Sequence, residues 1–138
     1  MTESLALLEE RRQQLFKELT QLGDFRPGSI SATYRKCGRI NCACARAGHP
    51  GHGPRYQWST TQKGKSRAQH LHLGPELVKV EKELSNYRRF EELCGELVTV
   101  NEQICRLRPV AEIKNEAELA LLKKTLQRKY NNKKSRQK

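Results

Sequence analysis

The stretch that decides the fold runs from Tyr34 to Pro54 and reads YRKCGRINCACARAGHPGHGP. From Cys37 onward the stretch shows no hydrophobic period and is rich in cysteine, glycine, histidine and proline, so we expect Cys37–Pro54 to form a compact loop. Three of the five cysteines and two of the four histidines of the chain lie in it. The loop therefore concentrates side chains that bind borderline and soft metal ions.

These side chains follow the spacing C-x4-C-x-C-x4-H-x2-H, formed by Cys37, Cys42, Cys44, His49 and His52. A tetrahedral Zn²⁺ site needs four such ligands, and ligands close in sequence close the chelate at little entropic cost. Three thiolates and one imidazole fit, with His52 as our first choice because it lies between two glycines, and His49 as the alternative. We prefer metal over free thiols because a loop poor in apolar residues has little other use for three thiols.

The chain shows no sign of export or membrane insertion. No apolar run reaches the about 18 residues of a membrane span, and the segment Met1–Glu10 carries three glutamates where a secretion signal carries positive charge. We therefore expect a cytoplasmic protein with no membrane partner. Thiols stay reduced in that compartment, which again favours a metal over disulfides.

Strand patterns lie on both sides of the loop. Residues Ile30–Cys37 alternate apolar and polar side chains, which is the period of a half-buried strand. Tyr56–Thr60 resumes this pattern, and the turn Gln62–Lys65 leads to Arg67–Leu73, so these two runs predict a hairpin. The three strands are expected to form a small antiparallel sheet around the loop.

Helical patterns occupy the rest of the chain. Ser4–Leu22 has leucines at spacings of three, four and seven, and Gly23 and Pro27 follow it. Between Leu77 and Leu107, apolar residues recur at alternating threes and fours, which is typical of a long coiled-coil-like helix. A last helix is expected over Ala111–Tyr130.

The sequence thus predicts an α+β protein with a small three-stranded antiparallel sheet and a zinc-binding loop, flanked by an N-terminal helix, a long coiled-coil-like helix and a C-terminal helix. Its 138 residues fit one domain, but only 36% are apolar, so bound metal would help to hold the fold. The expected segments are residues 1–24 (N-terminal helix), 25–74 (basic zinc-stapled β module), 75–108 (long helix), 109–130 (C-terminal helix) and 131–138 (disordered basic tail).

Positive charge is concentrated in the β module, residues 25–74. The net charge is +12, and residues 25–75 contain nine lysines and arginines but no aspartate or glutamate. Such a surface neutralises phosphates and releases counterions, and a two-stranded ribbon fits a major groove. We therefore expect a DNA or RNA backbone as the partner, with the choice between them left open. The candidate nucleic-acid-binding residues are Arg35, Lys36, Arg39, Arg46, Arg55, Lys63, Lys65, Arg67, Lys133, Lys134 and Arg136.

Three aromatic residues near the loop have two interpretations. Tyr34, Tyr56 and Trp58 could stack on bases, as aromatics do in single-strand binders. Aromatics at alternate strand positions are more often core, and we expect these to be core, with Trp58 packed against the long helix.

Catalysis is not indicated. The chain has no Ser/His/Asp grouping, nucleotide-binding glycine loop or paired carboxylates. His70 and His72 before the Pro75 helix invite comparison with a ββα-metal nuclease, but that class needs a set of hard ligands for its catalytic metal, the sequence gives no such set around these histidines, and we assign them no metal. The other alternative is a protein–protein assembly adaptor that acts, and forms homo-oligomers, through its helices.

The motifs Tyr34–Gly38 (YRKCG), Asn41–Cys44 (NCAC) and His52–Pro54 (HGP) resemble a small bacterial family of uncharacterised domains associated with mobile genetic elements. The resemblance covers about residues 25–107. It implies a Cys3His site that uses His52 and suggests an accessory subunit of a transposase or another mobile-element nucleoprotein enzyme. Residue 55 is arginine where the family pattern has an aromatic, which bears on the surface and not on the metal.

Overall fold

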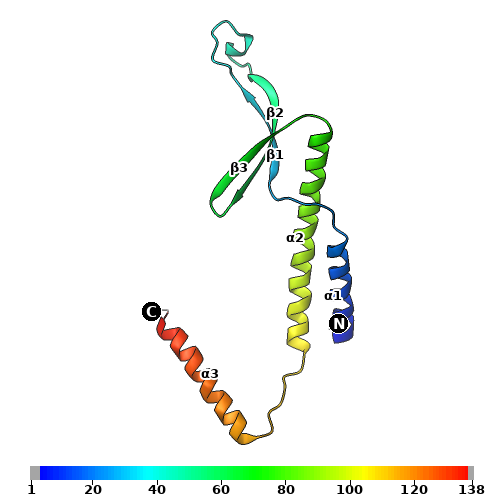
Figure 1. The fold of residues 1–138 in the computed structure, drawn as a ribbon, viewed down its shortest axis with the longest axis vertical. Coiled ribbons are helices and arrows are strands. Elements are labelled where there is room, and N and C mark those ends of the chain that lie inside the picture. Colours follow the sequence, from blue (N-terminus) through cyan, green and yellow to red (C-terminus); the bar gives the residue numbers. More distant parts are fainter. Residues whose placement is uncertain (1–3, 137–138) are drawn as a thin grey trace. The chain divides into compact units, whose positions relative to one another are not determined.

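The structure is a computed structural model, and it describes residues 4–136 (Figure 1). Its class is the expected one, α+β with a three-stranded antiparallel sheet. Residues up to Cys105 form one compact unit and residues from Arg106 onward form a second, and each is described separately below. The elements are α1 (Leu5–Thr20), β1 (Ser29–Arg35), the 3-10 helix η1 (Ala43–Ala45), β2 (His52–Gln62), β3 (Lys65–Leu71), α2 (Pro75–Leu107) and α3 (Glu116–Arg136).

The sheet is a meander in the order β1-β2-β3. Ile30 pairs with Trp58 and Ala32 with Tyr56, and the register shifts between Thr33 and Arg35. β2 begins at His52, four residues earlier than the sequence pattern indicates. The reason is backbone pairing with the end of β1, which needs no alternation of side chains.

One face of the sheet packs on the first half of α2. Leu71, Val80 and Leu84 are buried there, and Trp58 packs against them while its indole Nε1–H donates a hydrogen bond to the Pro27 carbonyl oxygen at 2.8 Å. Tyr56 and Ile30 join the same cluster, so the core interpretation holds for Tyr56 and Trp58.

Tyr34 departs from that interpretation. Its side chain is 50% exposed, so the expectation that it belongs to the core is wrong. It lies within the register shift at the end of β1, where the regular alternation of faces is lost.

The second half of α2 packs against α1 and forms a separate core. Its fully or nearly buried members are Leu8, Leu15, Leu93, Leu97, Val100 and Ile104. The two helices run antiparallel (Figure 1), since Arg12 in the middle of α1 donates to Asn101 near the end of α2 at 3.1 Å, whereas Glu18 near the end of α1 pairs with Arg89 in the middle of α2 at 3.2 Å. Residues 90–105 on this half of α2 contain four glutamates and no lysine or arginine. One helix therefore supports two separate cores, one against the sheet and one against α1.

Buried Glu83 ties the segment before β1 to α2. Its carboxylate lies 3.0 Å from the Arg26 guanidinium and 2.7 Å from the Lys79 ammonium, and its carbonyl oxygen accepts the Arg26 backbone N–H. The Arg26 guanidinium also lies over the Trp58 ring, 4.9 Å from the centroid. These contacts hold the sheet on the first half of the helix.

The second unit contains α3, which differs from the expected C-terminal helix at both ends. It begins at Glu116, because the Asn115 side chain caps it by accepting the backbone N–H groups of Ala117 and Glu118 at 2.9 and 3.2 Å. The helix continues to Arg136, so the expectation of a disordered tail from residue 131 is wrong for residues 131–136. No helix within residues 4–136 has the length and apolarity to cross a membrane.

Candidate metal centre

The chain between β1 and β2, residues 36–51, forms the metal loop. Its backbone turns at Cys42, whose N–H donates to the Arg39 carbonyl oxygen at 3.3 Å. The short helix η1 follows, with the Ala45 N–H donating to the Cys42 carbonyl oxygen at 3.0 Å. This tight turn supplies the sharp bend that Cys42 and Cys44, one residue apart, need in order to face a common centre.

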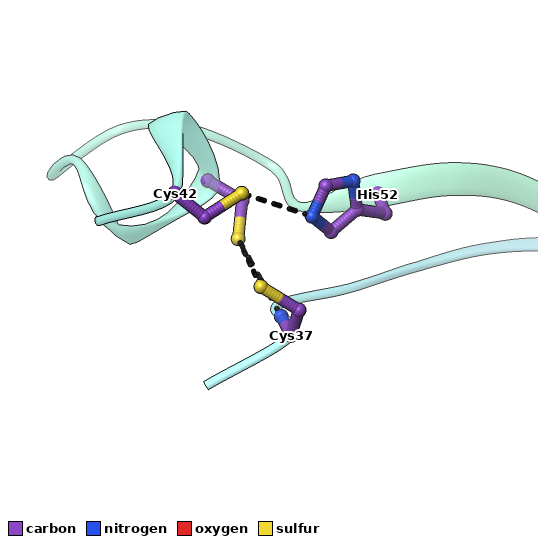
Figure 2. Close-up of side chains that lie close together, drawn as sticks. Cys37, Cys42 and His52 are labelled. Carbon is purple, nitrogen blue, oxygen red and sulfur yellow. Dashed lines mark hydrogen bonds between the residues drawn. The ribbon is translucent and has the colours of Figure 1, made fainter. Parts of the chain in front are cut away.

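Four side chains converge at the base of this loop: those of Cys37, Cys42, Cys44 and His52. Their ligand atoms all lie within 4.8 Å of one another. The Sγ atoms of Cys37 and Cys44 are 3.5 Å apart, and Cys42 Sγ is 3.2 Å from His52 Nε2. Figure 2 shows Cys37, Cys42 and His52 reaching the centre from three separate stretches of backbone.

The geometry separates the two candidate histidines. His49 lies outside the group of four, and its Nδ1 accepts the Gly51 backbone N–H at 3.0 Å. His52 is brought to the cysteines where β2 crosses close to the end of β1. A Cβ on Gly51 would lie 2.6 Å from the Arg35 carbonyl carbon, and one on Gly53 would lie 2.7 Å from the Thr33 carbonyl oxygen. Glycine on both sides of His52 therefore permits this close approach.

These four residues fit a tetrahedral metal ion. With zinc–sulfur bonds of about 2.3 Å, two sulfur ligands lie about 3.8 Å apart, and sulfur and nitrogen lie about 3.5 Å apart. The Cys37–Cys44 and Cys42–His52 separations are each within about 0.3 Å of these values, and every pair of ligand atoms lies within 4.8 Å. The Cys37 backbone N–H also donates to Cys44 Sγ at 3.4 Å, which is the kind of outer hydrogen bond that orients a thiolate ligand.

The thiol pKa values are shifted in opposite directions. The backbone N–H of Arg39, followed by His52 and Cys44, lowers the pKa of Cys37 from 9.0 to about 6. The Cys37 backbone N–H acts to lower the pKa of Cys44, but burial and the neighbouring Cys37 and Cys42 thiols outweigh it and raise that pKa. The cluster thus favours a thiolate at Cys37, the most exposed of the three cysteines.

The metal loop has almost no apolar core. Between Ser31 and Arg55 only Cys44 and Gly51 are buried. Side-chain packing therefore contributes little to holding this segment in one conformation.

The candidate basic residues gather at two ends of the sheet. Arg35, Lys36 and Arg55 line an open hollow of about 620 Å³ beside Cys37 and His52. Lys63, Lys65 and Arg67 line a second hollow of about 650 Å³ at the β2–β3 turn, where the Arg67 guanidinium donates to Gln62 Oε1 at 3.1 Å.

The remaining basic candidates are more scattered. Arg39 and Arg46 are exposed on the metal loop. The side chains of Lys133, Lys134 and Arg136 lie outside the described residues. His70 and His72 have ring centroids 5.2 Å apart, and the part of the chain that the structure describes adds no third metal ligand to them.

Sequence reasoning gave little attention to the polar face of the sheet. In the observed register, Gln57 pairs with Ser31 and with His70, so the three share the face opposite Trp58. The polar residues that alternate with the apolar ones along each strand could have indicated this face, but they are neither charged nor metal ligands.

The comparison with protein families gives one match, to a domain of unknown function, DUF6788, over residues 5–83. This range contains α1, the whole sheet with its metal loop, and the start of α2 through Glu83. The match contains the YRKCG, NCAC and HGP motifs. The resemblance based on these motifs was expected over about residues 25–107, so the match begins earlier and ends earlier than that range. No curated protein and no solved structure matches the chain. Because the match covers more than half of the residues, the chain belongs to the DUF6788 family.

Proposed function

We propose that this protein is a non-catalytic, zinc-dependent nucleic-acid-binding protein. One observation carries the proposal: a Cys3His cluster lies within a sheet module that has no acidic residue. A metal ion bound by the cluster would order the loop, and the positive charge of the module would attract a polyanion to it.

Zinc is the metal that the ligands favour. Three thiolates and one imidazole form a donor set typical of structural zinc sites, whereas calcium and magnesium prefer oxygen ligands. A loop with so little buried surface gains most of its stability from the ion, since metal binding to such small modules is coupled to folding.

Nucleic acid is the polyanion that the charge favours. Arg35, Lys36 and Arg55 form no ion pair within the described residues, and residues 25–75 contain no carboxylate to neutralise them. Phosphates that bind there release counterions, which is the main source of affinity in nucleic-acid binding. The ligand set of four protein groups also leaves no open coordination position of the kind catalytic zinc keeps. We therefore propose binding without catalysis.

The larger setting is proposed from the motif resemblance. A basic module on a helical scaffold suits an accessory subunit of a transposase or another mobile-element nucleoprotein enzyme. Its interaction with such an enzyme would then bring the enzyme to DNA or RNA.

The test combines metal analysis with binding. We expect about one zinc per chain in purified protein and a large loss in Cys42→Ser, whereas Cys94→Ser, on α2, keeps its metal. Binding of the zinc-loaded protein to nucleic acid should persist near physiological ionic strength and weaken with added salt in a linear log–log relation. Metal-free protein with a cooperatively folded loop, or affinity lost at modest salt, contradicts the proposal.

A second candidate function is an assembly adaptor. The α1–α2 pair has an open hollow of about 760 Å³ lined by Leu7, Arg11, Glu96, Val100 and their neighbours. Leu7, which lines this hollow, is 57% exposed, and an exposed apolar side chain beside a hollow favours contact with a partner. Sedimentation equilibrium tests homo-oligomerisation, with Leu7→Glu expected to weaken it. A monomer at all concentrations would argue against self-assembly.

A further inference from the structure

We infer that the outer face of the sheet, the face opposite α2, binds in the major groove of B-form duplex DNA. The inference rests on the proposed nucleic-acid-binding function and names the partner and the surface that contacts it. It uses the strand register, the identity of the side chains on each face, and the dimensions of the sheet.

The outer face is polar, small and free of acidic residues. Residues that pair directly across two strands share a face, and three pairs between β1 and β2 belong to this one: Ser29–Ser59, Ser31–Gln57 and Thr33–Arg55. On β3, His70, Ala68 and Ser66 pair with Gln57, Ser59 and Thr61 and so share the same face. Gln57 and Ser59 are half-buried and the others are exposed. The ten residues of this outer face are Ser29, Ser31, Thr33, Arg55, Gln57, Ser59, Thr61, Ser66, Ala68 and His70.

This composition disfavours single-stranded ligands. Proteins that bind single strands use exposed aromatic side chains on which bases stack. None of the ten outer-face positions is Phe, Tyr or Trp, because Tyr56 and Trp58 face α2. The outer face instead offers hydroxyls, an amide and a guanidinium, which read base edges and phosphates by hydrogen bonding.

The dimensions match a major groove. Neighbouring strands lie about 4.8 Å apart, so β2 with one neighbouring strand forms a ribbon about 10 Å wide, which fits the major groove of B-DNA, about 12 Å wide. Serine, threonine and alanine side chains are short, so the backbone of the sheet can approach the base edges closely. The major groove of A-form RNA is too deep and narrow for side chains to read, which selects DNA.

Gln57 and Arg55 are the candidates for base contacts. Gln57 lies on the central strand and is flanked by Ser31 and His70. Glutamine pairs with adenine and arginine with guanine through two hydrogen bonds each. The exposed cations of the metal loop and Lys63 at the tip of the β2–β3 turn are then placed to reach phosphates beside the groove, whereas Lys65 and Arg67 lie on the opposite face.

The experiment compares three ligands and three matched variants of the zinc-loaded full chain. Fluorescence anisotropy measures affinity for duplex DNA, duplex RNA of the same sequence, and single-stranded DNA at one ionic strength. Gln57→Glu places a negative charge on the outer face. Gln69→Glu makes the same change on the neighbouring strand, where Gln69 pairs with Trp58 on the opposite face, and Gln13→Glu makes it on α1.

We expect duplex DNA to bind at least about tenfold more tightly than the other ligands, and Gln57→Glu to weaken this binding by about tenfold or more. Gln69→Glu and Gln13→Glu should stay within about threefold of the unmodified protein, since long-range charge effects are screened. A duplex whose major groove is filled by glucosylated hydroxymethylcytosine should bind as weakly as the single strand.

Two results overturn the inference while leaving the proposed function intact: equal or tighter binding to single strands or RNA, or equal effects of the Gln57 and Gln69 changes. Absence of binding to all three ligands contradicts the proposed function itself. If Gln57→Glu loses zinc or its circular dichroism signal, Ser31→Glu, on the same face of β1, replaces it with the same expected result.

Discussion

At the residue scale, the metal centre shows which features a spacing pattern predicts. The spacing of Cys37, Cys42 and Cys44 was sufficient to predict that they would converge, because few residues separate them. The glycines on both sides of His52 are visible in the sequence and favoured His52, but the close approach of β2 to β1 that they permit is not visible there. His52 reaches the cluster because glycines on both sides allow β2 to approach β1, and His49 is instead bonded to the Gly51 N–H.

This difference predicts unequal effects of two alanine substitutions. His52→Ala removes a ligand and should lower zinc affinity by at least about tenfold, whereas His49→Ala should leave it within about threefold. Competition with a chromophoric chelator measures both affinities. Equal losses in the two variants would show that His49 also reaches the ion.

At the scale of elements, the helices and the existence of each strand were predictable, but the ends of the elements were less so. β2 extends to His52 because it pairs with β1, although Gly53 and Pro54 give no strand pattern. α3 starts later than expected because Asn115 caps it. In both cases the boundary depends on hydrogen bonds with partners that hydrophobic periodicity does not reveal.

The lack of an apolar core in the metal loop predicts local unfolding on metal removal. Chelation should abolish hydrogen-exchange protection where Thr33 pairs with Arg55 and Arg35 with His52. The core of Leu8, Leu15 and Leu93 does not involve the loop, so amides in α1 and the second half of α2 should keep their protection. Mass spectrometry of exchanged peptides checks both parts. An apo protein that retains protection throughout the loop would show that the ion is dispensable for its order.

The core between α1 and α2 makes a separate prediction about stability. Leu15 is 0% exposed, so Leu15→Ala should lower the free energy of unfolding of the helix pair by about 2–5 kcal/mol. Leu7→Ala, at a residue 57% exposed on the same helix, should change it by less than about 0.5 kcal/mol. Urea unfolding followed by circular dichroism measures the difference. Similar values for the two variants would mean that α1 does not depend on this core.

At the scale of the whole molecule, composition identifies the basic module and leads to the proposal of a polyanionic partner, but it does not indicate which surface would contact that partner. Charge identifies residues 25–75, whereas the strand register shows that Lys65 and Arg67 pair with Gln62 and Thr60, on the face opposite Gln57. Register follows from pairing across the sheet, and a list of charges does not contain it.

The basic turn between β2 and β3 predicts a change in salt dependence. If Lys63 at this turn and Lys36 in the metal loop each neutralise a phosphate of duplex DNA, replacing both by glutamine should reduce the log–log salt slope by about 1.8. Replacing Lys17 and Lys82, exposed on α1 and α2, removes the same charge and should leave the slope nearly unchanged. Anisotropy titrations from low to high salt provide the slopes. Equal reductions in the two double variants would mean that only net charge matters.

The contrast between the acid-free sheet module and residues 90–105, with their four glutamates, makes the unit up to Cys105 an electric dipole. In the field of a polyanion, such a dipole rotates before any contact forms, with the sheet attracted and the acidic half of α2 repelled. A larger fraction of the diffusional encounters with the polyanion then occurs with the sheet facing it. Reversing the charges of these glutamates should therefore slow the approach of the correct face even though overall attraction increases.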